Sequence, residues 1–500
     1  MFGDHSMLCK DQKGYFLRVR LIVFATCLSI LPFLLVTCEK DKVSTEEGAI
    51  DLTILYTNDE HGWMEETDAT DGAAKLMGIW RDREGYIEDD AFLILSGGDN
   101  WTGPAISTWF KGESMIEVMN AMHYDAAAIG NHEFDFNVSG LKARIDQALF
   151  PYLSANIRLK GTDSIPDFVL PYTIIEANNI QVGIIGLTTT TSSYSAFPAF
   201  VEDFDFIDYE SALQEIVPQI WGDGAEIVLC IAHICYSEMR ALAPTAEALG
   251  ISMIGGGHCN QLISEIYNGN VALIVGGWQM ANYARLDISF SEDDICVIGL
   301  QAETGANING VADTDIESIV NVWQQAANEA LGEVVGYVDT EIPRYSPQMH
   351  NLVTDSWLAT YSSADIAITN SGGIRQQINI GDITKGDIVG VLPFDNNILE
   401  LKLTGSEVIN CLGNNVVAGI TTTGGAYLHA DGTPLKADNV YSVLTTDYLY
   451  IQDASNFRLY DSDPYYTGMN YHQPTVDYIK SLNTSASDPL DNYLDYQSRR

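Results

Sequence analysis

The stretch Ala126-Ala127-Ala128-Ile129-Gly130-Asn131-His132-Glu133-Phe134-Asp135 decides the fold of this 500-residue chain. Its four apolar residues predict a buried strand, because a short apolar run bounded by glycine is typical of a strand inside a sheet. The strand ends at the glycine and is followed at once by Asn, His, Glu and Asp. Because open α/β sheets bind their ligands at the carboxyl ends of strands, this crowding of polar side chains predicts a functional site.

The same pattern, an apolar strand followed by metal-binding residue types, returns after four other predicted strands. Residues 50–58 run into Asp59 and His61, 91–95 into Asp99, 226–232 into His233, and 251–254 into His258 and Asn260. A helix predicted near 73–82 separates the strands at 50–58 and 91–95, and one near 114–122 separates the strand at 91–95 from the strand at 126–129. Strand, polar tip and helix in repetition predict a layered α/β domain, with the five tips at one sheet edge.

The side chains at these tips are imidazoles, carboxylates and amides, which are ligands of zinc, manganese and iron. Cysteine does not occur among them in a zinc-binding pattern, which disfavours a closed structural zinc site. A lone histidine at a strand end is more often a hydrogen-bonded loop residue, but five such tips together favour a metal site. An aspartate able to bridge and about seven ligands suit two ions roughly 3.5–4 Å apart, the arrangement used for phosphoester hydrolysis.

The charge of the chain excludes one class of partner. The composition is that of a globular protein, with 46% hydrophobic residues, and the formal net charge is −43. Nucleic acid is therefore not an expected partner, because binding to its backbone requires a basic surface. A small anionic substrate remains compatible with this charge if metal cations invert the local field.

The N-terminal residues predict export. Four basic residues precede an apolar run over 21–36, which is short for a stable membrane span and typical of a secretory signal peptide, here residues 1–37. The sequence Leu35-Val36-Thr37-Cys38 resembles a bacterial lipobox, although Thr37 departs from the small residue usual there. We therefore expect Cys38 to be lipidated, residues 38–49 to form a tether, and the protein to be anchored by lipid in the periplasm or at the cell surface.

The cysteines outside this leader do not predict a disulfide framework, because they are odd in number and scattered. The sequence predicts that most of them are small buried hydrophobic residues. They are Cys230, Cys235, Cys259, Cys296 and Cys411.

A second domain follows a helical segment. Residues 315–331 have helical spacing, with Ile316, Ile319, Val320 and Trp323 on one face, and a strand is predicted to restart at 333–339. The expected division is a metal domain over 50–305, a linker helix over 306–332, a second domain over 333–485 and a tail over 486–500. The tail is rich in Ser, Asp and Asn and is predicted to be frayed.

These motifs resemble a known family. Five motifs resemble those of the 5'-nucleotidase branch of the calcineurin-like metallophosphoesterases. They are Thr57-Asn58-Asp59-Glu60-His61-Gly62, Gly98-Asp99, residues 130–135, His233 and Gly256-Gly257-His258-Cys259-Asn260. Asn370-Ser371-Gly372-Gly373-Ile374-Arg375 and Leu392-Pro393-Phe394 resemble its nucleotide-binding domain. The likeness covers residues 50–482. It implies an α/β fold: a four-layer α/β/β/α metallophosphoesterase domain, a linker helix and an α+β C-terminal nucleotide-binding domain.

The resemblance also implies a role for each matching residue. One metal ion would be bound by Asp59, His61, Asp99 and Asn260, and the other by Asp99, Asn131, His233 and His258. His132 and Asp135 would form the catalytic pair, in which the imidazolium stabilises phosphoryl charge and the carboxylate orients the ring. The identity of the two divalent ions (Zn, Mn or Fe) stays open.

For the substrate, the resemblance implies contacts from Asn370 and Arg375 and stacking of a base on Phe394. Phe457 would cover the other face of the base, but relatives carry Gly-Gly-Asp-Gly-Phe where this chain has residues 452–457. Arg344 is a further candidate whose register is undefined, and the oligomeric state is undetermined.

Three functions stay open at this stage. The first is a 5'-nucleotidase, or a UDP-sugar or cyclic nucleotide hydrolase, that releases nucleoside and phosphate outside the cytoplasm. The second is a hydrolase of a non-nucleotide phosphoester or thiosulfate ester. The third is a non-catalytic, nucleotide-binding surface lipoprotein.

Overall fold

The computed structural model describes residues 50–67, 70–88, 91–291, 296–429 and 431–500. The predicted signal peptide, the tether and Cys38 lie outside these residues. Within the described part of the chain, no helix combines the length and the apolarity needed to cross a membrane.

The first of two large sheets carries the stretch that opens the sequence analysis. Its strand order is β14-β13-β1-β2-β3-β4. Strands β1 to β4 run parallel, β13 pairs antiparallel with β1, and β14 pairs antiparallel with β13. The strands are β1 (Ile50–Thr57), β2 (Phe92–Ser96), β3 (Ala126–Ala128), β4 (Tyr152–Leu153), β13 (Asn282–Phe290) and β14 (Val297–Ala306). The predicted strands that precede Asp59, Asp99 and Asn131 are therefore parallel neighbours.

A second sheet carries the other two polar tips, so the expectation of a single sheet edge is wrong. Its order is β11-β12-β10-β9-β7-β6. The strands are β6 (Tyr172–Ala177), β7 (Ile180–Leu187), β9 (Ile227–Ala232), β10 (Ile251–Gly255), β11 (Leu262–Tyr267) and β12 (Val271–Gly276). The carboxyl ends of β9 and β10 deliver His233 and His258 from this sheet, opposite the tips of the first one.

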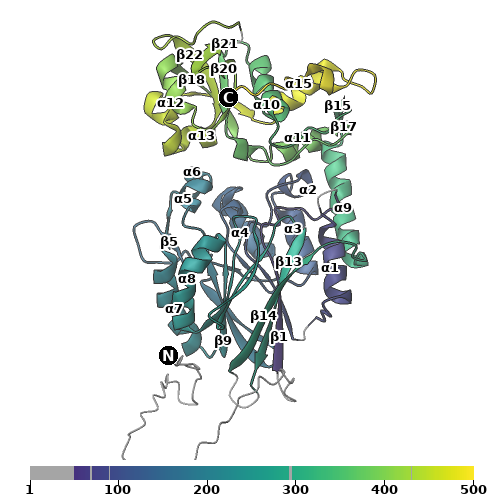
Figure 1. Ribbon diagram of the computed structural model, residues 1–500, viewed down its shortest axis with the longest axis vertical. Helices are drawn as coiled ribbons and strands as arrows, with labels where there is room; N and C mark the ends of the chain where they lie inside the picture. Colours follow the sequence, from purple (N-terminus) through teal and green to yellow (C-terminus); the bar gives the residue numbers. More distant parts are fainter. Residues whose placement is uncertain (1–49, 68–69, 89–90, 292–295, 430) are drawn as a thin grey trace, which may run out of the picture.

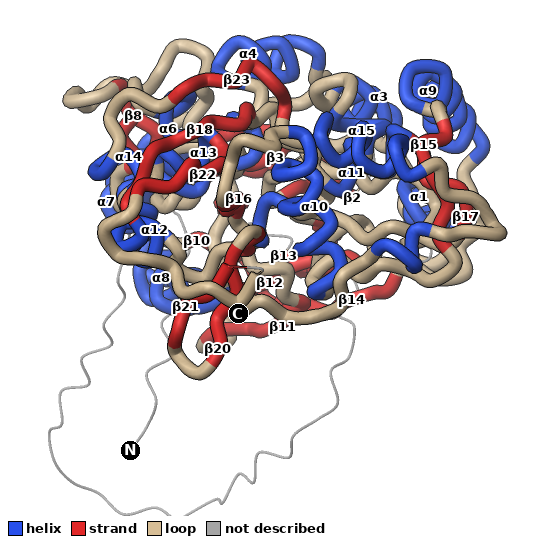
Figure 2. The backbone as a smooth tube through the Cα atoms, turned by 90° about the horizontal axis from the view of Figure 1, so that it is seen from above, coloured by secondary structure: helices blue, strands red, loops and turns tan. Residues whose placement is uncertain are grey.

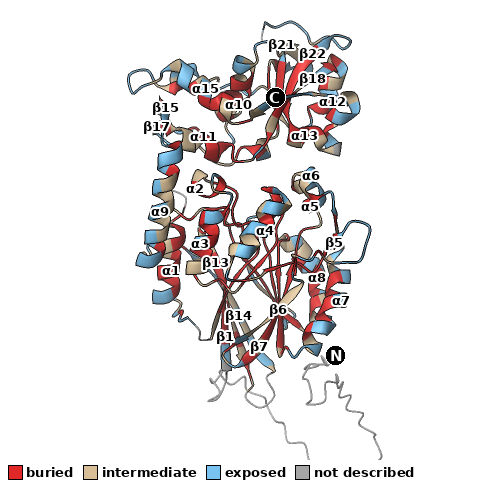
Figure 3. Ribbon diagram, turned by 180° about the vertical axis from the view of Figure 1, so that it is seen from behind, coloured by how far each residue is buried: buried red, intermediate tan, exposed pale blue. Residues whose placement is uncertain are grey.

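The two sheets pack face to face, with helices on both outer sides, and this confirms the four-layer α/β/β/α fold (Figure 1). Alternate residues of β1, such as Leu52 and Ile54, meet residues of β7 and β9, such as Ile184 and Leu229, in the central core. Helices α1 (Gly72–Asp82) and α3 (Glu113–Ala121) cover the first sheet, and α7 (Tyr209–Gly222) and α8 (Tyr236–Leu249) cover the second. Figure 3 shows buried residues on the inner faces of these helices and exposed ones outside.

The helix α9 (Thr314–Leu331) connects this four-layer unit to the rest of the chain. The Asp313 side chain begins it by accepting hydrogen bonds from the N–H groups of Asp315 and Ile316. Its predicted apolar face packs on the first layer, where the ring of Trp323 lies 4.9 Å from that of Phe110.

The C-terminal unit is built on a five-stranded sheet of order β19-β16-β22-β18-β23 (Figure 2). These strands are β16 (Ile366–Thr369), β18 (Asn397–Thr404), β19 (Val416–Ala418), β22 (Val440–Thr446) and β23 (Tyr465–Asn470). Two small sheets, β15 (Val334–Val338) with β17 (Gly381–Thr384) and β20 (Ile420–Thr423) with β21 (Ala426–His429), complete it. Its main helices are α10 (Pro347–Thr360), α11 (Lys385–Val391), α12 (Gly405–Cys411), α13 (Asp447–Ile451) and α15 (Gln473–Leu482).

The tail is packed rather than frayed. Leu490 is fully buried, and the guanidinium of Arg499 forms a two-pronged ion pair with Asp355 of α10. The carbonyl of Arg499 accepts a hydrogen bond from the N–H of Thr422, which places the C-terminus beside the hairpin β20–β21 (Figure 2). These few contacts could not be predicted from the sequence, because the composition of the tail is mostly polar.

Candidate metal centre and substrate cavity

Side chains from both sheets converge between the carboxyl ends of their strands. Two groups of three side chains could each hold a metal ion, because within each group the ligand atoms lie within 4.8 Å of one another: Asp59, His61 and Asp99 in one group, and Asp99, His233 and His258 in the other. Asp99 belongs to both groups, with its Oδ2 atom 2.9 Å from Nε2 of His233 and 4.0 Å from Nε2 of His61. A shared carboxylate between two ligand sets suits a pair of ions.

Hydrogen bonds orient the histidines of this cluster. The Nδ1–H group of His61 donates to the carbonyl of Thr102 at 3.0 Å, and that of His233 donates to the carbonyl of Gly97 at 2.8 Å. Each bond orients the ring so that Nε2 points into the cluster, the usual arrangement around metal-binding histidines. His258 presents Nδ1 instead, 3.2 Å from Nε2 of His233.

Asn131 supplies an independent test of whether the cluster fits a metal ion. Its side chain is 2% exposed, and its Oδ1 atom has no hydrogen-bond partner among the described residues. An unpaired buried carbonyl oxygen costs free energy unless another group satisfies it. A cation beside Asp99 and His233 would do so, and the donor set as a whole therefore fits metal binding.

The backbone is strained at most of the candidate ligand positions. Asp59, His61, Asp99, His258 and Asn260 have φ angles between 47° and 68°. Few residues other than glycine adopt this left-handed conformation, and it costs of order 1–3 kcal/mol each unless the surroundings enforce it. Such strain clusters at functional sites, because it aims side chains that relaxed loops would direct elsewhere.

Glu133 holds the loops of β2 and β3 together beneath the ligands. Its carboxylate accepts hydrogen bonds from the N–H groups of Asp99, Asn100 and Gly130 at 2.6–2.8 Å. Burial raises its pKa to about 8. Gly130 is required here, since a Cβ atom at this position would lie 2.2 Å from Oδ1 of Asp99. The glycine and the glutamate of the opening stretch thus position Asp99.

The electrostatics of the cluster favour a cation. Burial raises the pKa of Asp59 to about 6, partly offset by His233. Burial alone would lower the pKa of His233, but the carboxylates of Asp99 and Asp59 outweigh it and raise that pKa. The buried acidic groups therefore create a negative field that attracts positive charge.

His132 and Asp135 lie beside the cluster as a hydrogen-bonded pair. The Nδ1 atom of His132 lies 2.8 Å from Oδ2 of Asp135, across a short helical turn that spans His132–Phe134. Burial lowers the pKa of His132, while Asp135 and Asp99 raise it, and the net effect is a rise. This rise favours the charged imidazolium, and the ring borders the cavity described next.

A cavity of about 280 Å³ lies between the metal-binding cluster and the C-terminal unit. From the N-terminal side it is lined by Asp59, His61, Asp99, Asn131, His132, Asp135, His258 and Asn260, and from the C-terminal side by Asn370, Arg375, Phe394 and Tyr448, among others. Arg375 reaches the cluster itself, since its Nη2 atom donates to Nε2 of His61 at 3.2 Å. The ring of Phe394 stacks on His132 with centroids 5.6 Å apart.

Phe457 does not line this cavity, so its predicted stacking role is wrong. Its side chain is fully buried in the cluster that contains Leu401 and Tyr450, where no ligand can reach it. The residues before it form a short turn, Asp453–Ser455, that directs the ring into the core. The departure of residues 452–457 from the family pattern accompanies this change.

The buried position of Phe457 yields a test. Phe457→Ala is expected to cost about 3–5 kcal/mol of unfolding free energy, because it removes a large ring from a packed core. It should leave KM unchanged. Urea unfolding followed by fluorescence, with steady-state kinetics on the same sample, checks both. A raised KM at unchanged stability would show that the ring binds substrate after all.

Tyr448 is an aromatic residue of the C-terminal unit that does line this cavity. It lies at the start of α13, lines the cavity together with Phe394, and its ring lies 6.5 Å from that of Phe197. Phe197 and Phe200 line the same cavity from the N-terminal unit. The run Thr445-Thr446-Asp447-Tyr448 is a strand end with a polar tip, which is the signal that could have identified it.

Arg344 lies beside the cavity but is not among the described residues that line it. Its Nε atom donates to the carbonyl of Ile374 at 2.7 Å, and its guanidinium lies 4.5 Å from the ring centroid of Tyr345. Burial and the neighbouring Arg375 lower its pKa to about 10. Arg344 thus supports the loop that carries Arg375.

The cysteines include a disulfide, although their number and spacing did not predict a disulfide framework. Cys235 and Cys259 are bonded to each other, whereas Cys230 and Cys411 are free and buried as predicted. A signal was present, because Cys235 follows His233 by two residues and Cys259 follows His258 directly. Two histidines expected at one site bring their neighbouring cysteines together.

Known proteins resemble this chain along most of its length. Residues 334–430 match the family model of the 5'-nucleotidase C-terminal domain. A snake venom 5'-nucleotidase from Crotalus adamanteus is 27% identical over 424 residues, covering 75% of this chain and 71% of the relative. Human 5'-nucleotidase is 27% identical, and the match covers 74% of this chain and 72% of the human protein. UshA from Yersinia enterocolitica is also 27% identical, and the match covers 83% of this chain and 84% of UshA.

Solved structures share the fold. A 5'-nucleotidase precursor from Thermus thermophilus superposes with a TM-score of 0.74 at 21% identity, covering 90% of this chain and 99% of the other. The sulfate thiohydrolase SoxB of Thermus thermophilus superposes with a TM-score of 0.67 at 16% identity, covering 90% of this chain and 98% of SoxB. Along most of its length the chain is therefore similar in sequence and in fold to 5'-nucleotidases, and its C-terminal unit matches the model of their C-terminal domain.

Proposed function

We propose that this protein hydrolyses nucleoside 5'-phosphates to nucleoside and phosphate outside the cytoplasm. The observation that carries the proposal is the cavity in which the metal-binding cluster, the His132–Asp135 pair, Arg375 and two aromatic rings meet. A phosphate at the cluster and a planar base at the rings would both be accommodated there.

The proposed metal ligands divide between two ions. One ion would be held by Asp59, His61, Asp99 and Asn260. The other ion would be held by Asp99, Asn131, His233 and His258. Two divalent ions at such a site activate water and neutralise the charge that develops on the phosphoryl oxygens. The tip residues Asp59 and Asp99 are nearly inaccessible to solvent, so their charges act there with little screening.

His132 is the residue proposed to act on the substrate directly. Its charged imidazole would donate a hydrogen bond to a phosphoryl oxygen and stabilise the charge that builds up on it. Asp135 is a positioning residue, because it contacts His132 and fixes its tautomer and charge.

The C-terminal unit is proposed to hold the nucleoside. The fork of donors on Arg375 suits a phosphate oxygen, and Asn370 offers both a donor and an acceptor. Phe394 and Tyr448 offer ring faces for the base, since every base has a π-face that stacks on aromatic rings. The proposed functional divisions are the metal domain over residues 50–305, the linker over 306–332 and the substrate domain over 333–485, followed by the packed tail.

Phe394→Ala and Tyr448→Ala test the base-binding role. Each variant is expected to raise KM for AMP about 5- to 100-fold, because stacking of one base contributes about 1–3 kcal/mol. Turnover of p-nitrophenyl phosphate, which has no base, should change far less. Steady-state kinetics with both substrates checks this, and an equal loss on both would contradict base recognition.

The proposed function is tested by measuring the inorganic phosphate that the purified full-length protein releases from candidate substrates. AMP, ATP, UDP-glucose, cyclic nucleotides and bis-p-nitrophenyl phosphate would each be supplied with Mn²⁺, with Zn²⁺ and with chelator. A second, monoester-specific phosphatase would be added where the first product is itself a phosphate ester. Metal-dependent release from AMP supports the proposal. Turnover of the generic ester without any nucleotide would assign the site to a different phosphoester.

Export is part of the proposal and has its own support. The Cys235–Cys259 disulfide suits an oxidising compartment outside the cytoplasm. Two of the similar proteins are 5'-nucleotidases of snake venom, which is a secreted fluid. Lipidation of Cys38 is proposed from the lipobox-like sequence alone, and mass spectrometry of the mature N-terminus would test it.

A further inference from the structure

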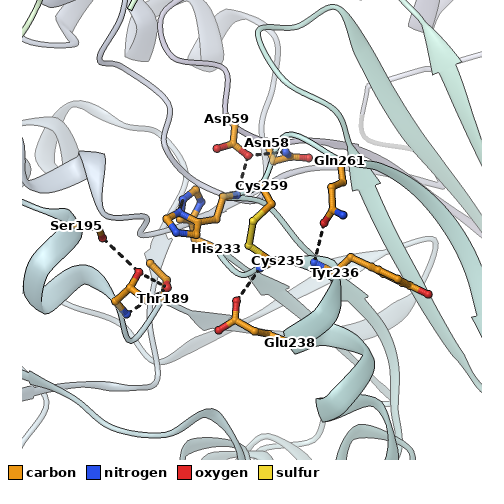
Figure 4. The surroundings of a disulfide bond; sticks show 12 residues. Asn58, Asp59, Thr189, Ser195, His233, Cys235, Tyr236, Glu238, Cys259 and Gln261 are labelled. Carbon is orange, nitrogen blue, oxygen red and sulfur yellow. Dashed lines mark hydrogen bonds between the residues drawn. A yellow bond between two sulfur atoms is a disulfide. The ribbon is translucent and has the colours of Figure 1, made fainter. Parts of the chain in front are cut away.

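The disulfide Cys235–Cys259 joins the two segments that deliver the metal-binding histidines of the second sheet (Figure 4). The cysteines are 24 positions apart in sequence, and their Cα atoms are 5.2 Å apart. Cys235 lies two residues after His233, and Cys259 stands directly between His258 and Asn260. The cross-link thus lies beside three of the seven proposed ligands.

The segment that carries Cys235 is firmly held without the disulfide. Cys235 is the N-cap residue of α8, and its N–H group donates to Oε2 of Glu238 at 3.0 Å. His233 is fully buried, and its ring is fixed by the bond to Gly97. This end of the cross-link is therefore an anchor that the helix and the sheet provide.

The turn that carries Cys259, residues 258–260, lies between two backbone hydrogen bonds, from the N–H of Gly257 to the carbonyl of Ile234 and from the N–H of Gly277 to the carbonyl of Gln261, and has few further contacts of its own. Cys259, Asn260 and Gln261 are exposed, unlike the buried strand β10 before them. The N–H of His258 donates to Oδ2 of Asp59 at 2.8 Å, and the side chain of Gln261 accepts from the N–H of Tyr236 at 3.1 Å (Figure 4). The first of these bonds uses a carboxylate that is itself a proposed ligand.

The backbone on both sides of Cys259 is in the costly left-handed conformation. The φ angle is 68° at His258 and 51° at Asn260. Such residues keep this conformation only where the surrounding structure enforces it. Because residues 259–261 are exposed, the disulfide to the anchored Cys235 is the covalent constraint that acts directly on the turn between its two hydrogen-bonded ends.

We propose that the Cys235–Cys259 disulfide is a positioning device for the metal centre, which fixes the turn that presents His258 and Asn260 to the two ions. The proposal rests on the ligand set proposed above. Opening the disulfide, with two electrons and two protons from an added reductant, gives two thiols and frees the turn to relax. The ion held by Asp99, His233 and His258 should be affected most, because an imidazole is a stronger ligand than an amide oxygen.

The test measures Co²⁺ binding rather than activity. Chelator-stripped protein would be titrated with Co²⁺ by calorimetry and visible absorption in three forms: oxidised, reduced with a phosphine that is then removed, and Cys235→Ser/Cys259→Ser. Reduction and the double substitution are expected to weaken one of the two sites about 10- to 100-fold and to change the Co²⁺ spectrum, as the loss of groups that orient ligands does elsewhere. Reoxidation should restore the oxidised behaviour.

Two controls accompany the titration. Cys411→Ala removes a buried cysteine of the C-terminal unit and should leave both Co²⁺ affinities unchanged. The phosphine should have no effect on the double variant, which shows that the effect on the wild-type protein comes from this disulfide. If the double variant does not fold, the comparison of oxidised, reduced and reoxidised wild-type protein decides between the outcomes.

The outcomes separate this inference from the proposed function. Unchanged Co²⁺ affinities and spectrum, with only a lower unfolding temperature, would overturn the positioning role and leave a purely structural disulfide. Oxidised protein that binds no Co²⁺ at all would instead overturn the ligand set on which the inference rests.

Discussion

Asp99→Asn is expected to abolish tight binding of both metal ions and to reduce kcat more than about 1,000-fold, since loss of a single donor to transition-state charge already costs about 10²–10³-fold. The reason is that Asp99 is the one side chain common to both ligand groups. Asparagine keeps the shape of the side chain, and its oxygen can still accept from the N–H of His132, as Oδ1 of Asp99 does at 2.8 Å. The substitution therefore removes the charge while it preserves the turn.

Metal content after dialysis, measured by mass spectrometry, and kcat on the same sample check this prediction. Asp287→Asn is the matched control, because Asp287 lies on β13 of the same sheet and pairs with Arg285 away from the cluster. The control should retain two ions and full turnover. Retention of both ions by Asp99→Asn, or loss of only one, would show that the two ligand groups do not share a carboxylate.

The sequence predicted the metal-binding strands well because their pattern is local. A buried strand and the polar residues after it are contiguous, so β1, β2, β3, β9 and β10 were found together with the residues at their ends. The linker helix was found for the same reason, since Ile316 and Trp323 repeat at helical spacing. Local patterns do not say which strands share a sheet, and the five tips were therefore placed at one edge instead of between two sheets.

The errors concern properties that depend on tertiary contacts. A bulky ring such as Phe457 has the same local signal whether it lines a cavity or fills a core, and here the preceding turn buries it. The position of Tyr448 in the cavity was not predicted, because it depends on a contact with the N-terminal unit, where the ring of Phe197 lies beside it. The pairing of Cys235 with Cys259 likewise follows from the meeting of β9 and β10, which is a property of the sheet.

His132→Asn is expected to lower kcat about 10²–10³-fold while KM and the metal content stay nearly unchanged, because it removes one stabilising donor to the transition state. The amide of asparagine can still donate to Asp135, so the partner of His132 keeps a bond and only the end that faces the cavity is lost. His123→Asn is the matched control, since His123 is a surface residue that pairs with Glu88. Loss of metal ions from His132→Asn would instead identify His132 as a ligand or as a structural support of one.

The companion variant Asp135→Asn separates the charge of His132 from its position. In the native protein the carboxylate of Asp135 helps to raise the pKa of His132, so removing that charge should lower the pKa. If the reaction requires the imidazolium, activity is lost as pH rises through this pKa. The alkaline limb of the kcat profile should therefore move to lower pH in Asp135→Asn. A limb that does not move, in an enzyme that keeps its metal ions, would mean that His132 acts in its neutral form and that Asp135 serves only to hold the ring.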